Sequence, residues 1–183
     1  MLYNRKEIKY GEKMSKKILV AYGSWTGSTQ EVAEAIGQSL REGGAEVDVL
    51  PAKSVKDLKP YQGAVIGSAI RIGKLHSTVV NLIKKHHTAL SQMPVAYFVV
   101  CLTMRKDSPA NRAATNHFLK PLTHEVPDVK PVSTGLFGGK YDPKKVAFFL
   151  NWVLSAATLP AGDFRNWDLI RQWSESLRPL FNL

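Results

Sequence analysis

Six consecutive residues, Ser24-Trp25-Thr26-Gly27-Ser28-Thr29, place four hydroxyl groups and a glycine directly after a short apolar run. The run, residues 18–22, has the composition of a buried parallel strand, and a helical apolar pattern begins after Thr29. The first N–H groups of a helix lack partners inside the helix, and the helix dipole favours an anion there. The strand, the hydroxyl-rich turn and the helix start together predict a phosphate site.

The turn contains no lysine and neither of the glycine patterns that mark nucleoside-triphosphate and dinucleotide sites. Hydroxyl groups without a cation suit a single phosphate monoester, such as that of FMN. Ser28-x-x-Glu31 also fits a capping box, which is a purely structural alternative. A capping box would not need Ser24, Thr26 and Gly27 as well, so we favour the phosphate site.

Short apolar runs alternate with helical patterns along the chain, as an α/β domain requires. The runs predict strands at 17–22, 47–50, 64–68, 95–102 and 132–136. The helical patterns predict helices at 29–42, from Ser77 past Leu90, at 109–122 and from Asn166-Trp167 onward, with a short helical turn at 54–58. These elements predict a doubly wound five-stranded parallel sheet, in which a ligand lies beyond the carboxyl ends of the strands. The loops 23–28, 69–76 and 102–108 are expected at that end.

The composition describes an ordinary α/β domain with an unusual charge. The 183 residues suit one domain, 14–183, preceded by a polar extension, 1–13, without the apolar stretch of a signal peptide. The single cysteine, Cys101, excludes an internal disulfide and fits a reducing cytoplasm. The formal net charge of +10 attracts anions, but no RNA- or DNA-binding motif accompanies it, so we expect no nucleic-acid partner. The histidines and Cys101 show no metal-ligand grouping, so no metal is predicted.

The turn at 24–29 resembles the flavodoxin phosphate loop, Ser/Thr-x-Thr-Gly-x-Thr. This resemblance implies the strand order 2-1-3-4-5 and an FMN cofactor. The implied phosphate ligands are Ser24, Thr26, Gly27, Ser28 and Thr29, and Trp25 is an implied cofactor contact. A segment from about 138 to 163 has no counterpart in a minimal flavodoxin, and its position near the fifth strand corresponds to a long-chain-type insertion.

The centre of that segment, residues 146–159, is apolar apart from one narrow polar stripe, and Lys140, Lys144 and Lys145 precede it. The apolar run is too short to span a bilayer, which takes about 20 residues. Two interpretations remain open at this stage. Residues 140–159 either contact an anionic membrane surface or a quinone, or form a helix packed against the core.

A second run, residues 67–77, continues into Leu82-Ile83-Lys84-Lys85-His86 and Met93-Pro94. It is similar to the flavodoxin-type, menaquinone-dependent protoporphyrinogen IX dehydrogenases of haem biosynthesis, over about residues 16–178. The resemblance implies a quinone-linked enzyme whose FMN takes electrons from the porphyrinogen and passes them to menaquinone. It also implies a cytoplasmic protein, peripheral on the inner face of the cell membrane.

The resemblance places the flavin ring between two loops. The implied ring contacts are Ala69, Ile70, Arg71, Ile72, Gly73, Leu102, Thr103, Met104 and Arg105. Ile70, Ile72, Leu75 and Met104 would form apolar walls, and Gly73 would supply a peptide that bonds the flavin. The catalytic candidates are Arg71, His76 and Arg105.

Each of these roles has a simpler alternative. Arg71, Lys74, Arg105 and Lys106 either steer the propionates of a porphyrin or form a solvated basic rim. His76 is either a proton carrier or a solvated residue before a helix. Cys101 is expected to be a small buried side chain near the flavin.

The function as a whole also has alternatives. The chain could be an FMN electron carrier without a substrate of its own, an FMN-dependent quinone reductase fed by NAD(P)H, or a flavin-free interaction protein. The sequence does not fix the redox partner or the oligomeric state.

Overall fold

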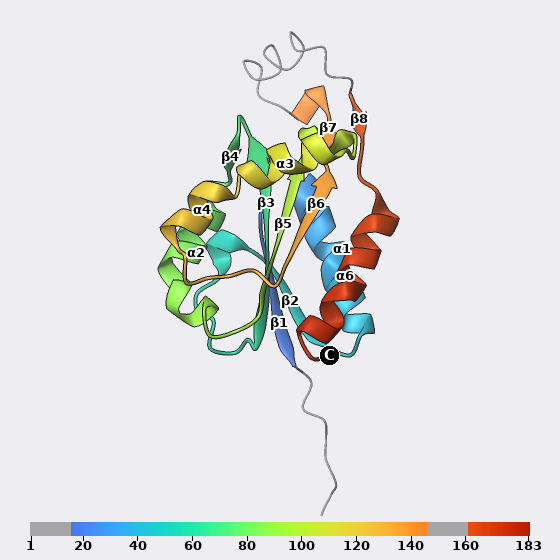
Figure 1. The fold of residues 1–183 in the computed structure, drawn as a ribbon. Helices are drawn as coiled ribbons and strands as arrows, with labels where there is room; N and C mark the ends of the chain where they lie inside the picture. The colour runs from blue at the N-terminus through green and yellow to red at the C-terminus, as the bar shows by residue number, and fades with distance from the viewer. Residues whose placement is uncertain (1–15, 146–160) are drawn as a thin grey trace, which may run out of the picture.

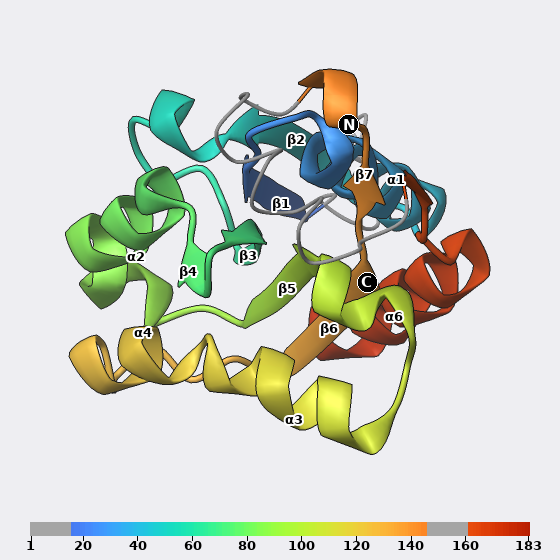
Figure 2. The same ribbon diagram turned by 90° about the horizontal axis from the view of Figure 1, so that it is seen from above.

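The computed structural model describes residues 16–145 and 161–183. A parallel sheet separates two layers of helices, with α1 and α6 on one face and α2, α3 and α4 on the other (Figures 1 and 2). The five parallel strands are β1 (Lys17–Gly23), β2 (Glu46–Pro51), β3 (Gly63–Arg71), β5 (Val95–Cys101) and β6 (Ser133–Gly138). Their order across the sheet is β2-β1-β3-β5-β6. Numbered along the chain, this is the expected order 2-1-3-4-5, so the predicted sheet is confirmed.

The helices are α1 (Ser28–Glu42), α2 (Ser77–Leu90), α3 (Pro109–His117), α4 (Lys120–Glu125) and α6 (Trp167–Leu180). The single helix expected at 109–122 is wrong, because the chain forms α3 and α4 there. Pro121 lacks the N–H that a continuous helix would donate to the His117 carbonyl, and its ring would clash with that carbonyl, so α3 ends at His117 and Pro121 lies in the first turn of α4.

The short helix expected at 54–58 is also wrong. A 3₁₀ turn forms earlier, at Ala52–Ser54, and Val55 is extended with φ −74° and ψ 115°. Val55 and Leu58 are both buried against the α2 face of the sheet. Their side chains reach the core from an extended backbone, so this segment needs no helical period.

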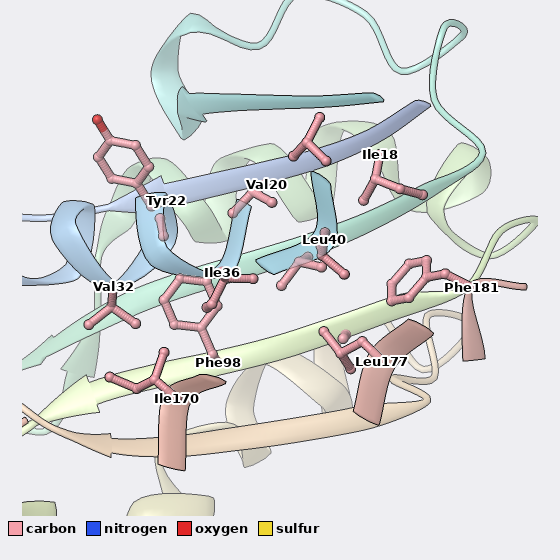
Figure 3. Close-up of a cluster of buried hydrophobic side chains, with 14 of the residues drawn as sticks. Ile18, Val20, Tyr22, Val32, Ile36, Leu40, Phe98, Ile170, Leu177 and Phe181 are labelled. Atoms are coloured by element: carbon pink, nitrogen blue, oxygen red, sulfur yellow. The ribbon is translucent and has the colours of Figure 1, made fainter. Parts of the chain in front are cut away.

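Alternate residues of the central strands face opposite layers, so buried hydrophobic residues gather on both faces of the sheet. Figure 3 shows the core under α1 and α6, where Ile36, Leu40, Phe98, Leu177 and Phe181 lie together. Another core lies under α2 and α4. The sheet is buried on both faces, which explains the continuous apolar runs in the sequence.

The backbone expected as a loop at 69–76 forms a hairpin instead. Strand β4 (Lys74–Leu75) pairs antiparallel with the end of β3, and Ile70 lies opposite Leu75. Ile72 and Gly73 form the turn with φ values of 49° and 69°. Positive φ at both central residues is the geometry that gives a two-residue hairpin the right twist.

A second small ladder joins β7 (Lys140–Tyr141) to β8 (Gly162–Asp163). It lies beyond the carboxyl end of the sheet, as does the β4 hairpin (Figure 1). The apolar run 146–159 and the extension 1–13 lie outside the described residues. Within the described ranges, no helix has both the length and the apolar character needed to cross a membrane.

Candidate functional site

The hydroxyl-rich turn connects the end of β1 to the start of α1. The Ser24 Oγ accepts a hydrogen bond from the Gly27 N–H at 3.0 Å, which closes the turn on itself. Gly27 is the residue before the helix, and its φ of 94° lies in the left-handed region that glycine adopts without strain. No side chain in the described part of the protein caps this helix end. The first N–H groups of α1 are therefore left for an acceptor from outside the chain.

Thr29 supplies a second sign of a missing acceptor. It is fully buried, and its Oγ1 has no hydrogen-bond partner among the described residues. A buried hydroxyl without a partner costs free energy, so such groups are rare unless a ligand completes them. A phosphate oxygen at the helix start would accept from this hydroxyl and from the free N–H groups. The residues of the turn therefore fit the phosphate monoester of FMN.

The capping box that Ser28 and Glu31 could have formed does not exist. Helix α1 begins at Ser28, with Gly27 before it, so Glu31 lies one position too far along the helix to close the box. The Glu31 carboxylate instead accepts from the Arg165 Nη1 at 2.7 Å. The purely structural alternative for this turn is therefore wrong.

Trp25, Arg71 and His76 come together beside the turn. The Trp25 and His76 rings stack with centroids 4.5 Å apart, and the Arg71 guanidinium carbon lies 5.6 Å from the Trp25 centroid. The three residues come from the phosphate turn, the end of β3 and the residue before α2. The fold thus unites two of the three catalytic candidates with one of the expected cofactor contacts.

The protonation of His76 follows from its surroundings. It precedes α2, and its Nδ1 accepts from the Thr78 N–H at 3.4 Å, with the Thr78 Oγ1 at 2.9 Å. The proton of the neutral ring therefore lies on Nε2. Burial lowers the pKa of His76 below its ordinary value of 6.5, so the ring is neutral at pH 7. His76 is partly buried.

The two loops expected beside the flavin ring follow neighbouring strands, β3 and β5, and so share one edge of the sheet. The 3₁₀ turn Leu102–Arg105 begins directly after β5. Met104 is wrong as a ring wall, because it is 5% exposed and packs in a core cluster that includes Cys101 and Leu119. Arg105 is exposed, and its Nη1 donates to the Leu102 carbonyl at 3.4 Å.

Lys74 of the β4 hairpin lies directly opposite Arg71 in the ladder with β3. Lys74 also lines a groove of about 410 Å³ with residues of α2 and α4. Ile72, at the tip, is 75% exposed. Cys101 is buried as expected, and its Sγ lies 3.7 Å from the Thr115 Oγ1.

The fold also brings up residues that the sequence reasoning missed. Lys140 and Asp142 line a small hollow with Thr26, Ser28 and Glu31, and Arg165 reaches the same helix start. The turn carries no cation of its own, but the fold supplies Lys140 and Arg165, which lie more than 100 residues further along the chain. The one signal in the sequence was the lysine-rich start of segment 138–163, which pointed to a membrane rather than to the turn.

Comparison with known proteins also indicates a flavodoxin domain. A family model for the flavodoxin domain matches residues 19–156. A protoporphyrinogen IX dehydrogenase [quinone] of Leishmania major is 31% identical over 138 residues, which are 74% of this chain and 59% of that protein. The protein of that name from Escherichia coli is 35% identical over 92 residues, 49% of this chain and 51% of the relative. An NAD(P)H dehydrogenase (quinone) of Methylocella silvestris is 28% identical over a stretch that covers 37% of this chain and 45% of the length of that protein.

The chain thus spans little more than half the length of the first two of these relatives, which are oxidoreductases. Among solved structures, oxidised flavodoxin 2 from Bacillus cereus superposes with a TM-score of 0.53 and 21% identity, covering 78% of this chain and 98% of the other. That likeness concerns the fold. The match to the flavodoxin domain supports FMN, the cofactor expected from the hydroxyl-rich turn. The chain belongs to the flavodoxin domain family.

Proposed function

We propose that this protein is an FMN-dependent, quinone-linked dehydrogenase that oxidises protoporphyrinogen IX in haem biosynthesis. The observation that carries this proposal is the match to the Leishmania major enzyme over 74% of the chain. The geometry supports it in two ways. The start of α1 is open to the flavin phosphate, and the half-buried Arg71 beside it would bind a carboxylate of the substrate, which is a flat macrocycle.

The turn would hold the flavin phosphate through the free N–H groups at the start of α1 and the hydroxyls of Thr26 and Thr29. Residues 69–73 and 102–105 would flank the flavin ring, and neither range contains an aromatic residue that could cover it. Bound FMN supplies the redox chemistry, taking electrons from the porphyrinogen and giving them to the quinone.

Arg71 is the side chain best placed to bind a propionate. It is half-buried and lies against the Trp25 ring, so its guanidinium is already oriented and can bind a carboxylate with two parallel hydrogen bonds. Arg105 is exposed and would act by steering the anionic substrate rather than by fixing it. The neutral His76 ring packs against Trp25 and would hold that side chain in place, and its Nε2–H would be available as a hydrogen-bond donor.

A quinone reductase fed by NAD(P)H is the second candidate, favoured by the match to the Methylocella silvestris protein. Both candidates share the flavin and a quinone, and they differ in the electron donor. For either one, we place the protein at the inner face of the membrane, where a lipid-soluble quinone is available and where the basic start of segment 140–159 would meet anionic lipid.

One experiment separates the candidates. FMN-loaded protein is mixed with protoporphyrinogen IX and a menaquinone analogue, and the growth of porphyrin fluorescence is compared with a flavin-free control. Flavin- and quinone-dependent growth is expected. Quinone reduction by NADPH without any porphyrin signal would establish the reductase, and no turnover with either donor would leave an electron carrier.

A matched pair of variants tests the role of Arg71. Arg71→Gln is expected to raise the KM for the porphyrinogen at least tenfold while FMN stays bound. Arg112→Gln, which removes an exposed arginine of α3 paired with Asp107, should leave the KM unchanged. Equal KM values for the two variants would remove Arg71 from the substrate site.

A further inference from the structure

Arg165 lies between β8 and α6, and its side chain is only 3% exposed. Its guanidinium donates to both carboxylate oxygens of Asp163. It also donates to the Glu31 carboxylate at 2.7 Å and reaches the Ser28 carbonyl at 3.5 Å. The ring of Trp167 lies 4.5 Å from the guanidinium carbon. Each nitrogen of the guanidinium thus donates at least one hydrogen bond, and two of the partners belong to the first turn of α1.

A buried guanidinium is costly unless acceptors surround it, so this set of contacts holds the side chain in one position. Asp163 binds Arg165 from the neighbouring strand and anchors it, and this contact lowers the pKa of Asp163. The anchored arginine then reaches across to the Glu31 carboxylate. The direction of the Glu31 side chain is therefore set by a residue from the far end of the chain.

The position of Glu31 matters because it lines the same small hollow as Thr26 and Ser28 of the phosphate turn. An unpaired carboxylate one turn into the helix would repel a phosphate bound there. Pairing with Arg165 neutralises this carboxylate and removes the repulsion.

We propose that Arg165 is a positioning residue for the flavin phosphate. By holding and neutralising Glu31, it keeps the start of α1 open to a phosphate monoester. This inference rests on the phosphate placement under the proposed function, but not on the substrate or the electron acceptor. It therefore stands or falls separately from the porphyrinogen assay.

The test compares FMN with riboflavin, which has the same ring system but no phosphate. Affinities are measured by the quenching of flavin fluorescence for wild type, Arg165→Gln, Glu31→Gln and the double variant. We expect Arg165→Gln to weaken FMN at least tenfold and riboflavin less than twofold. Glu31→Gln should bind FMN as well as wild type or better. The double variant should recover FMN affinity to within about threefold of Glu31→Gln, because the carboxylate that Arg165 restrains is gone.

Arg178→Gln is the matched control, since Arg178 lies on α6 and, like Arg165, donates to a carbonyl of α1, here that of Ser39, far from the phosphate turn. It should lower the melting temperature without changing either flavin affinity. Equal losses of FMN and riboflavin in Arg165→Gln, or no recovery in the double variant, would overturn the proposal. If Arg165→Gln fails to fold, Glu31→Gln decides alone: a tenfold weaker binding of FMN would show that Glu31 assists the phosphate and would refute the inference. Wild-type protein that binds FMN no tighter than riboflavin would overturn both this inference and the phosphate placement.

Discussion

Replacing Thr29 by Val should make the flavin-free protein more stable and the flavin complex weaker. Thr29 is fully buried near the start of α1, and its Oγ1 has no partner among the described residues. Valine has nearly the same shape and differs mainly by the missing hydroxyl. The substitution therefore removes one polar atom and leaves the surrounding packing in place.

The two effects can be estimated separately. An unpaired buried hydroxyl costs about 1–3 kcal/mol, so the free energy of unfolding of the apoprotein should rise by about 1 kcal/mol or more. A hydrogen bond to a charged group contributes about 1.5–3 kcal/mol, so the loss of the bond to the phosphate should weaken FMN by a factor of about 10 to 150. Opposite signs in the two measurements distinguish a ligand-directed hydroxyl from an ordinary structural one.

The assay pairs urea unfolding of the apoprotein with titration of FMN against flavin fluorescence. Ser39→Ala is the control, because the Ser39 Oγ is also buried without a partner, in the same helix but about 15 Å further along it. It should stabilise the apoprotein and leave FMN affinity unchanged. If Thr29→Val destabilised the apoprotein, or if it bound FMN as tightly as wild type, the assignment of this hydroxyl to the phosphate would be refuted.

Three further predictions concern the elements around the site. A Cβ on Gly67 would overlap the Phe98 ring, so Gly67→Ala should lower the unfolding free energy by about 3 kcal/mol in urea, and an unchanged midpoint would contradict this packing. Ile72 is 75% exposed and holds a φ of 49°, a backbone conformation that asparagine adopts with less strain than isoleucine. Ile72→Asn should therefore raise the unfolding free energy by about 1 kcal/mol. A decrease would mean that the contacts of the isoleucine side chain stabilise the protein more than the backbone strain destabilises it. His76 has a pKa lowered by burial, so its contribution to stability is complete above its ordinary value of 6.5 and is lost as the pH falls through the folded pKa. NMR titration of His76 should show this lowered pKa, and a pKa above 6.5 would contradict the burial.

Local sequence patterns predicted most of the sheet and the helix starts, because the forces behind them are local. A strand that is buried on both faces must be continuously apolar, and the run at 95–101 could be read directly. The last helix starts as its residues suggest, since the Asn166 side chain accepts from the Leu169 N–H at 3.0 Å. The break between α3 and α4 was also visible in principle, because Pro121 stands inside the expected helix.

Two errors arose where the sequence carried no local signal. The β4 hairpin turns on Ile72-Gly73, and a β-branched residue at positive φ is the opposite of the Asn-Gly or Asp-Gly pair that marks such turns. Met104 lies in a loop at the ligand end of the sheet, where spacing does not tell an apolar residue that faces a ligand from one that faces the core. The structure places Met104 in the core with Cys101, so the apolar wall expected there has one member fewer.

The phosphate turn shows most clearly where local reasoning ends. Its hydroxyls and its glycine are adjacent in sequence, and their spacing alone predicts the site. The same spacing allowed Glu31 to close a capping box, but the helix starts at Ser28 with Gly27 before it, which places Glu31 one position too far along. The Glu31 carboxylate is held instead by Arg165, which stands 134 positions away and reaches it only after α6 has packed beside α1. The sequence therefore predicts which groups could bind an anion at this helix, whereas the partner of Glu31 follows only from tertiary packing.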